Sequence, residues 1–321
     1  MPFPEFNPIA LAIPTPWFTL AIRWYALAYV AGILIGWRYA VAMVRNRRLW
    51  GAGPATVDDR GVDDLILWVT LGVIVGGRLG YILFYSTDTI WRNPWQILRT
   101  WEGGMSFHGG LIGVTAALIG FAISQKLNLL RVADVAAPAV PIGLFFGRLA
   151  NFVNGELWGR PTKLPWGVVF PDAGAQARHP SQLYEAGLEG IVLFLILRLA
   201  THRLKWLNRP GAMAGLFLSF YGLFRFAVEQ VREPDVGMPQ FPFGLSMGMI
   251  LSLPMVVIGL CLLMWALIRG PVEGPDPGAS LEPDLDDVLS DYPHSVLPDD
   301  WVDRVRRGDG ARTAAATTGV A

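Results

Sequence analysis

Seven runs of mainly apolar residues dominate this sequence, and each is close to the length of about 20 residues that a helix needs to cross a bilayer. They cover approximately Trp17–Val44, Val62–Tyr85, Phe107–Ser124, Val135–Phe152, Gln182–Ala200, Ala212–Val231 and Phe243–Ile268. We therefore predict an all-α, polytopic membrane protein with seven transmembrane helices.

The composition supports this class. Hydrophobic residues make up 53% of the chain and charged residues only 16%, whereas soluble domains carry about 25% charged residues. Gly and Trp, both frequent in bilayer proteins, number 36 and 13. Several runs contain Arg, Glu or His, so a soluble all-helical core is the competing interpretation. Seven such runs favour the membrane, and disorder of the whole chain and collagen are excluded.

The loop charges predict the orientation. Ten Lys and Arg residues follow the first, third, fifth and seventh runs, against six in the opposite loops. Lys and Arg accumulate on the cytoplasmic side, so we expect the N-terminus outside and the C-terminus in the cytoplasm. The N-terminus has no basic segment before an apolar core, and it does not resemble a cleaved signal peptide.

The chain divides into two parts, a seven-span membrane domain of residues 1–269 and a tail of residues 270–321. The tail holds eleven acidic and four basic residues and many Pro and Gly, so we predict that it is a disordered cytoplasmic segment. The single Cys261 lies in an apolar run and can form no intrachain disulfide.

Polar residues inside the predicted spans gather at one depth. Ionisable groups in a bilayer are expensive and are functional candidates by default. With the predicted orientation, most of them lie in the outer half: Tyr25, Arg78, His108, Arg148, Asn151, Asn154, Glu156, His179, Glu185, Tyr221, Arg225, Glu229 and Arg232. Only Asp134 lies at the inner end. At 100° per residue, Tyr221, Arg225, Glu229 and Arg232 form one helical stripe. A single outer-leaflet cavity is the simplest explanation, and interfacial ion pairs and snorkelling side chains are the alternative.

These residue types suit a phosphate ligand. Guanidinium groups are planar, permanently charged and able to bind phosphate oxygens with two donors, so we expect an anionic phospholipid head group near Arg148 and Arg225. His108 is the side chain best suited to proton exchange near neutral pH. Gly109 and Gly110 beside it leave room for a substrate.

Several motifs resemble one family. Gly147–Gly159 reads GRLANFVNGELWG, which is similar at every fixed position to the signature of bacterial prolipoprotein diacylglyceryl transferases. Similar blocks occur in the family's order: GGRLGY at Gly76–Tyr81, HGGL at His108–Leu111, RHPSQLYE at Arg178–Glu185 and YGLFRFAVE at Tyr221–Glu229.

The resemblance implies a seven-span inner-membrane enzyme with its active site toward the periplasmic leaflet. Such an enzyme transfers the diacylglyceryl group of phosphatidylglycerol to the lipobox cysteine of a preprolipoprotein and releases glycerol 1-phosphate. The resemblance also implies catalytic roles for His108, Arg148 and Arg225. Phosphatidylglycerol would contact a larger set, namely Arg148, Tyr25, Arg78, Asn151, Asn154, Glu156, Tyr221 and Gly109, with possible support from Glu229, Arg232 and His179. We expect no metal, no cofactor and no nucleic-acid partner.

A mechanism follows from that chemistry. The acceptor thiol has an ordinary pKa of about 8.5 and needs a base, and the leaving phosphate gains negative charge. We assign the base to His108 and the charge stabilisation to Arg148 and Arg225. In the alternative, His108 donates a hydrogen bond to the lipid and the thiol loses its proton to water.

Two other classes compete with this one. An anion transporter would need polar access from both sides, and an intramembrane serine protease would need Ser and His on facing helices. The sequence favours neither: Asp134 is the sole inner-side candidate, and Ser106 lies only two residues from His108.

Overall fold

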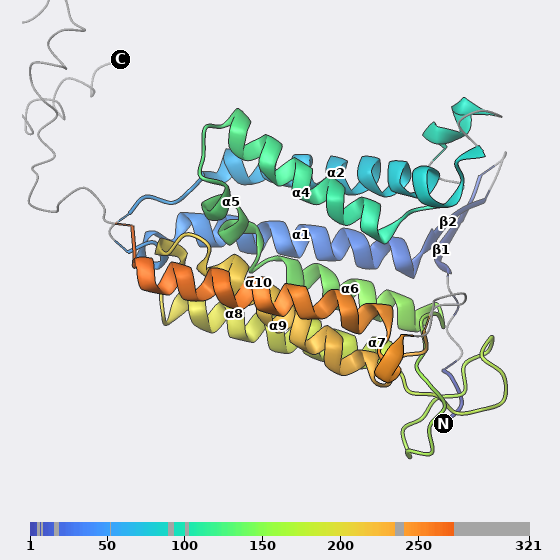
Figure 1. Cartoon of the computed structure of the whole chain (residues 1–321). Helices are drawn as coiled ribbons and strands as arrows, with labels where there is room; N and C mark the ends of the chain where they lie inside the picture. Colours follow the sequence, from blue (N-terminus) through green and yellow to red (C-terminus); the bar gives the residue numbers. More distant parts are fainter. Residues whose placement is uncertain are drawn as a thin grey trace, which may run out of the picture. The chain divides into compact units, whose positions relative to one another are not determined.

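The structure is a computed structural model that describes residues 1–272 except 5, 6, 8, 16–18, 52, 89–92, 100–102 and 235–240. Most of the described residues are helical (Figure 1). The elements in chain order are β1 (Ile9–Pro14), β2 (Thr19–Arg23), α1 (Trp24–Arg45), η1 (Arg47–Leu49), α2 (Asp59–Tyr85), η2 (Pro94–Leu98), α4 (Phe107–Ser124), α5 (Leu129–Ala136), α6 (Val140–Val153), α7 (Ser181–Glu185), η4 (Ala186–Val192), α8 (Leu193–His202), η5 (Trp206–Asn208), α9 (Ala212–Glu229), η6 (Pro242–Gly244) and α10 (Met247–Arg269). Beyond its first three residues, the predicted tail lies outside the described residues.

Five helices, α1, α2, α4, α9 and α10, are long and apolar enough to cross a membrane, and α5 with α6 makes a sixth candidate if the bent pair is one span. Their outward side chains are apolar and exposed, as with Leu71, Leu83 and Ile258. A large exposed apolar exterior is unfavourable in water but matches lipid. The chain is therefore a polytopic helical membrane protein.

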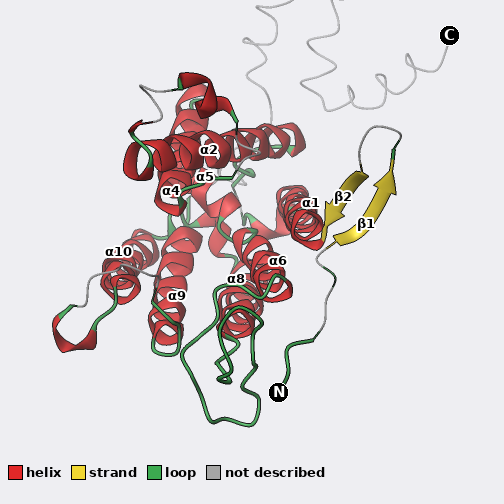
Figure 2. Cartoon of the chain, turned by 90° about the vertical axis from the view of Figure 1, so that its right-hand side faces the viewer, coloured by secondary structure: helices red, strands yellow, loops and turns green. Residues whose placement is uncertain are grey.

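The predicted first span begins too early. Its residues 19–23 form strand β2, which pairs antiparallel with β1 through contacts such as Ala12 with Ala21, and helix α1 begins at Trp24. The sequence of β2, TLAIR, is apolar enough to be read as part of a span. The all-α prediction is wrong for this hairpin, which extends from the start of α1 (Figure 2).

The predicted fourth span is also corrected. Instead of one helix over 135–152, α5 ends at Ala136 and α6 begins at Val140, and their axes differ by 44°. Pro138 and Pro141 flank this junction. Proline cannot donate a backbone hydrogen bond and disfavours helix in the residue before it, which explains the break.

The fifth predicted span is helical from Ser181 to His202, but it is not regular. Its middle section, η4, is a π-helix that separates α7 from α8. Wide turns of this kind are rare and occur frequently at functional sites.

The helices pack in neighbouring groups (Figure 2). Helix α2 packs along α4, α10 along α9, and α1 along α6, while α6 also contacts η4. The chain runs back and forth, so the start of α1, the end of α6 and the end of α9 lie at the same end of the bundle as the hairpin (Figure 1). This arrangement brings the motif residues of several helices to one end.

The opposite end holds the apolar core. Trp50, Val62, Phe121, Val132 and Leu197 are fully or almost fully buried there in one cluster.

Asp134 lies at this end too. Its buried carboxylate accepts hydrogen bonds from the backbone N–H groups of Gly211 at 2.6 Å and Ala214 at 2.9 Å. It therefore satisfies donors of the first turn of α9, which have no partner inside the helix. This contact gives Asp134 a structural role at the end of the bundle opposite the other intramembrane carboxylates.

Helices α2 and α4 approach each other closely because small residues line their interface. A Cβ atom added at Gly113 of α4 would lie 2.8 Å from the α-carbon of Gly76, and one added at Gly80 would lie 2.5 Å from the α-carbon of Gly109. Small residues at such spacing let helix backbones pack tightly in membranes. Gly109 therefore has a packing role independent of any substrate.

This interface makes a prediction about stability. We expect Gly113→Ala to destabilise the protein by about 1–3 kcal/mol, because the new methyl group overlaps the backbone of α2. Gly110→Ala is the matched control, since its Cβ would meet only the carbonyl oxygen of Val73, at 4.0 Å. Thermal unfolding in detergent measures both variants. Equal midpoints would contradict the packing role.

Candidate active site

Two arginines share one buried carboxylate. Glu185, at the end of α7, places Oε2 3.2 Å from Nε of Arg148 on α6 and Oε1 3.1 Å from Nη1 of Arg225 on α9. Three segments far apart in the sequence therefore meet at one side chain. Arg148 and Arg225, which the sequence analysis assigned to one cavity, both contact Glu185.

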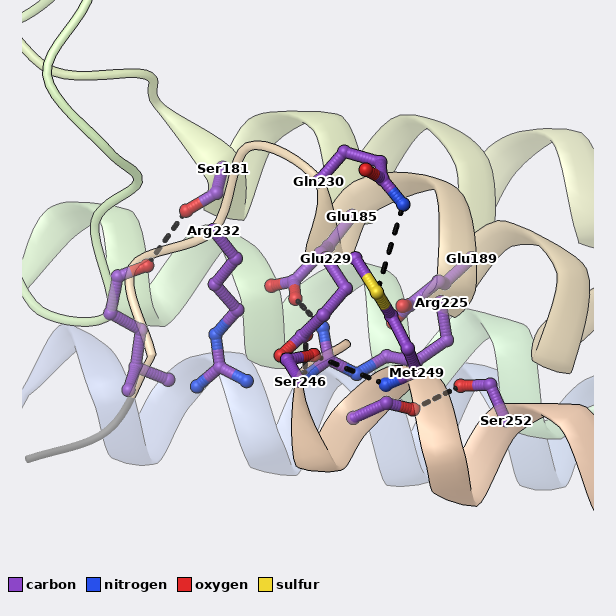
Figure 3. Close-up of polar contacts among 12 residues, drawn as sticks. Ser181, Glu185, Glu189, Arg225, Glu229, Gln230, Arg232, Ser246, Met249 and Ser252 are labelled. Atoms are coloured by element: carbon purple, nitrogen blue, oxygen red, sulfur yellow. Dashed lines mark hydrogen bonds and ion pairs between the residues drawn. The ribbon is translucent and has the colours of Figure 1, made fainter. Parts of the chain in front are cut away.

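Two further carboxylates extend this group. Glu189, on η4, places Oε2 3.2 Å from Nη2 of Arg148, and Glu229, one turn after Arg225 on α9, places Oε2 2.6 Å from Nη2 of Arg225. Figure 3 shows Glu185, Glu189, Arg225 and Glu229 lying close together. We call Arg148, Glu185, Glu189, Arg225 and Glu229 the arginine–carboxylate cluster. Its five charges come to a formal −1 when all are ionised.

The start of α10 supports the cluster. Ser246 caps this helix by accepting a hydrogen bond from the N–H of Met249, and its hydroxyl donates to Oε1 of Glu229 at 2.9 Å (Figure 3). Gly248 leaves the space that Glu229 fills, since an added Cβ would lie 2.5 Å from the carboxyl carbon of Glu229. The position of Glu229 is therefore fixed from two sides.

The cations and anions of the cluster differ in exposure. The side chains of Glu185 and Glu189 are 0% exposed, while those of Arg148 and Arg225 are 17% and 14% exposed. Among the described residues, Nη1 of Arg148 and Nε of Arg225 contact no acceptor. Because a guanidinium carries five donors, each arginine keeps donors for an incoming anion while carboxylates hold it from behind.

The GRLANFVNGELWG motif forms the end of α6 and a tight turn. Nδ2 of Asn151 donates to Oε1 of Glu156 at 2.7 Å. Gly155 and Leu157 have φ values of +67° and +58°, a conformation that is strained for leucine. The carbonyl of Leu157 accepts a hydrogen bond from Ser181, and that of Glu156 accepts one from Gln182. The turn is thus tied to the start of α7, four residues before Glu185.

Gly159 joins three segments next to this turn. Its N–H donates to the carbonyl of His179 at 2.8 Å, and it forms an antiparallel bridge with Arg232. An added Cβ would lie 2.5 Å from the carbonyl oxygen of Val231. His179 lies 3.3 Å from the hydroxyl of Tyr184, and burial lowers the pKa of His179 below its usual range. Gly159 therefore links the loops that carry His179 and Arg232, and Figure 3 shows Arg232 near Glu229 of the cluster.

Two tyrosines lie near these groups. Tyr221 on α9 interacts electrostatically with the charges of Arg148, Arg225, Glu185 and Glu189. Tyr25, in the first turn of α1, lies 3.1 Å from the hydroxyl of Tyr29 and interacts with Asn151 and Glu156. Asn154 is the C-cap residue that follows α6, and it is exposed.

Three predicted residues lie on the α2–α4 pair instead. Arg78 is buried and donates to the carbonyls of Ile97, Gly103 and Gly104. His108 is exposed in the first turn of α4, with its ring 5.8 Å from that of Phe107. Gly109 contacts the α2 backbone.

The contacts described for His108 and Gly109 do not join them to the cluster. Arg78 has a loop-ordering role, because its donors bind the backbone between α2 and α4.

Sequence reasoning missed Glu189 and Ser246. Glu189 did carry a signal, because it is an ionisable residue inside an apolar run, four positions after Glu185. Ser246 carried none beyond a helix-capping residue type. Over the described part of the chain, no group of three or more His, Cys, Asp or Glu side chains is arranged to hold a metal ion.

The fold and the cluster define a class, a polytopic helical membrane protein with two arginines held by buried carboxylates at one end of the bundle.

Residues 8–265 match the family described as prolipoprotein diacylglyceryl transferase. The chain is 59% identical to the phosphatidylglycerol–prolipoprotein diacylglyceryl transferase of Phenylobacterium zucineum (strain HLK1), with 86% of this chain and 97% of that protein covered. It is 54% identical to the enzyme of the same name from Caulobacter sp. (strain K31), with the same coverage.

A third relative, from Rhodopseudomonas palustris (strain ATCC BAA-98 / CGA009), carries that name too and is 52% identical, covering 84% of this chain and 92% of that protein. The chain belongs to the prolipoprotein diacylglyceryl transferase family and is a transferase. The resemblance inferred from the motifs is confirmed.

Proposed function

We propose that this protein transfers the diacylglyceryl group of phosphatidylglycerol to the lipobox cysteine thiol of preprolipoproteins and releases glycerol 1-phosphate. The names of its relatives state both substrates. The observation that carries the proposal is the pair of partly exposed arginines backed by fully buried carboxylates. Such a pair suits a phosphate whose charge increases during the reaction.

In this mechanism the thiol sulfur attacks the glyceryl carbon that carries the phosphate. A carbon–sulfur bond forms, the carbon–oxygen bond to phosphate breaks, and the electron pair leaves with glycerol 1-phosphate. Arg148 and Arg225 bind the phosphate oxygens and stabilise the developing charge. Tyr25, Asn151, Asn154, Glu156 and Tyr221 line the lipid head group, with Arg78 and Gly109 at its far side. Glu229, Arg232 and His179 support this set.

The thiol proton passes to His108 in our proposal. His108 is exposed and has no described contact with the cluster, so the peptide must bring its thiol between them. We expect the rate of the chemical step to rise between pH 6 and 8 in the wild type and His108→Gln to remove that dependence. Single-turnover rates measured across this pH range test it. A wild-type rate that is flat with pH and unchanged in His108→Gln would exclude His108 as the base.

We also propose seven spans, with α7, η4 and α8 together forming one of them. The N-terminus then lies outside, the C-terminus in the cytoplasm, and the cluster toward the periplasmic leaflet of the inner membrane. The excess of Lys and Arg in the alternate loops supports this orientation. In this proposal residues 1–269 form the catalytic membrane domain.

The proposed reaction is tested with a synthetic lipobox peptide, purified protein and phosphatidylglycerol of defined chains. We expect the peptide mass to increase by one diacylglyceryl group, with release of glycerol 1-phosphate in equal amount. A peptide whose cysteine is replaced by serine is the control and should stay unmodified. An unmodified cysteine peptide with folded protein would contradict the proposed function and favour lipid binding or transport.

A further inference from the structure

Glu189 is a buried charge that the mechanism above does not use. It lies on the π-helical segment η4, its side chain is 0% exposed, and Oε2 lies 3.2 Å from Nη2 of Arg148. Within the described residues, its Oε1 has no hydrogen-bond partner. Burying an ionised carboxylate costs several kcal/mol, so a position that keeps one there needs a compensating interaction, and Arg148 provides it.

We propose that Glu189 is a positioning residue for Arg148. Together with Glu185 it holds one edge of the guanidinium, so that the other edge faces the phosphate when the carbon–oxygen bond breaks. This inference rests on the proposed function.

The geometry of the guanidinium supports this role. Nε and Nη2 lie on the same edge of the group, and they contact Glu185 and Glu189, respectively. Nε meets Glu185 as an ion pair without a hydrogen bond, so within the described residues the directional hydrogen bond on this edge is the one from Nη2 to Glu189. Nη1, on the other edge, then keeps its donors for the substrate. Donors fixed before the reaction stabilise developing charge without reorganisation.

The local helix geometry places Glu189 on a segment that packs against α6. The π-helical turn packs against α6, since an added Cβ at Gly190 would lie 2.7 Å from Cβ of Phe145. Phe145 and Arg148 are one turn apart on α6. The segment that carries Glu189 therefore contacts the helix that carries Arg148.

The charge balance predicts how the kinetic constants change. With Glu189 ionised the cluster is formally −1, and without it the cluster is neutral. Loss of this negative charge does not weaken the attraction of the cluster for the phosphate of the bound lipid before the reaction. The guanidinium of Arg148, however, loses its fixed orientation. We therefore expect Glu189→Gln to lower kcat while KM for phosphatidylglycerol stays the same or falls.

The test compares Glu189→Gln, Glu189→Asp and the wild type in the peptide assay, with kcat and KM measured for phosphatidylglycerol and thermal unfolding followed in parallel. We expect Glu189→Gln to lower kcat about 10- to 100-fold, because small misplacements of catalytic groups cost up to about 10²-fold. Glu189→Asp keeps the charge and should recover part of that loss. Asp134→Asn is the matched control, since it removes another fully buried carboxylate that lies at the opposite end of the bundle. It should lower stability but keep kcat.

Three results would overturn the proposal for Glu189. Each assumes that the wild-type protein is active. The kcat of Glu189→Gln could stay within threefold of the wild type, or its KM could rise as much as its kcat falls. Finally, Asp134→Asn could lose as much kcat as Glu189→Gln while the two variants are equally stable. The last result would show that the loss reflects weakened folding. A wild-type protein that leaves the peptide unmodified contradicts the proposed function instead, so the two failures are distinguishable.

Discussion

Replacing Arg148 with Ala is expected to lower the transfer rate about 10²- to 10³-fold, the usual cost of removing one preorganised donor from developing negative charge. Arg148 is partly exposed, contacts two buried carboxylates and keeps Nη1 without an acceptor among the described residues. No other side chain reaches Glu185 and Glu189 from α6 in the contacts described. Initial rates of peptide modification at saturating phosphatidylglycerol measure the effect.

The alanine variant also leaves buried Glu189 without its cation and Glu185 with Arg225 alone, so its folding must be separated from its chemistry. Arg148→Lys serves this purpose, because Lys keeps the positive charge but lacks the planar fork that binds two oxygens at once. We expect Arg148→Lys to fold and to remain strongly impaired. Wild-type rates in a folded Arg148→Lys protein would show that a point charge suffices, and near-wild-type rates in Arg148→Ala would remove Arg148 from the mechanism.

Glu185→Ala is expected to destabilise the protein by about 3–5 kcal/mol, the usual cost of breaking a buried ion pair from one side. The effect is large because Glu185 pairs with Arg148 and Arg225 together and is 0% exposed. Its removal leaves two guanidiniums facing each other without the anion between them. Thermal or denaturant unfolding in detergent, followed by tryptophan fluorescence, measures the loss.

Glu233→Ala is the matched control for Glu185→Ala. Glu233 also pairs with an arginine, Arg178, at 3.1 Å, but its side chain is 44% exposed. Exposed ion pairs contribute about 0–1 kcal/mol, so this variant should unfold close to the wild type. Equal stability of the two variants would contradict the structural role of Glu185.

Most of the helices were predictable because each apolar run carries its own signal. Length and hydropathy place α2, α4, α9 and α10 within a few residues. The hairpin before α1 was not predictable in this way, because a strand depends on a partner across a turn and its apolar residues resemble the start of a span. The break between α5 and α6 did carry a signal, since Pro138 and Pro141 stand in the middle of the predicted span.

The site was predictable within one helix and less so between helices. The spacing of Arg225 and Glu229 places them on one face of α9, and the structure pairs them. Periodicity does not fix how one helix is rotated against another, so the shared role of Glu185 between Arg148 and Arg225 could not be derived. For the same reason the sequence grouped His108 and Arg78 with the cluster, whereas their described contacts lie on the α2–α4 side.

The central claim is that the arginine–carboxylate cluster binds the phosphate of the lipid donor. The most direct measurement is a structure of the protein in lipid nanodiscs with phosphatidylglycerol bound. We predict that the phosphate lies within hydrogen-bonding distance of Nη1 of Arg148 and a donor of Arg225, with Glu185 and Glu189 still behind Arg148. A phosphate bound by other side chains, away from both guanidiniums, would contradict the account.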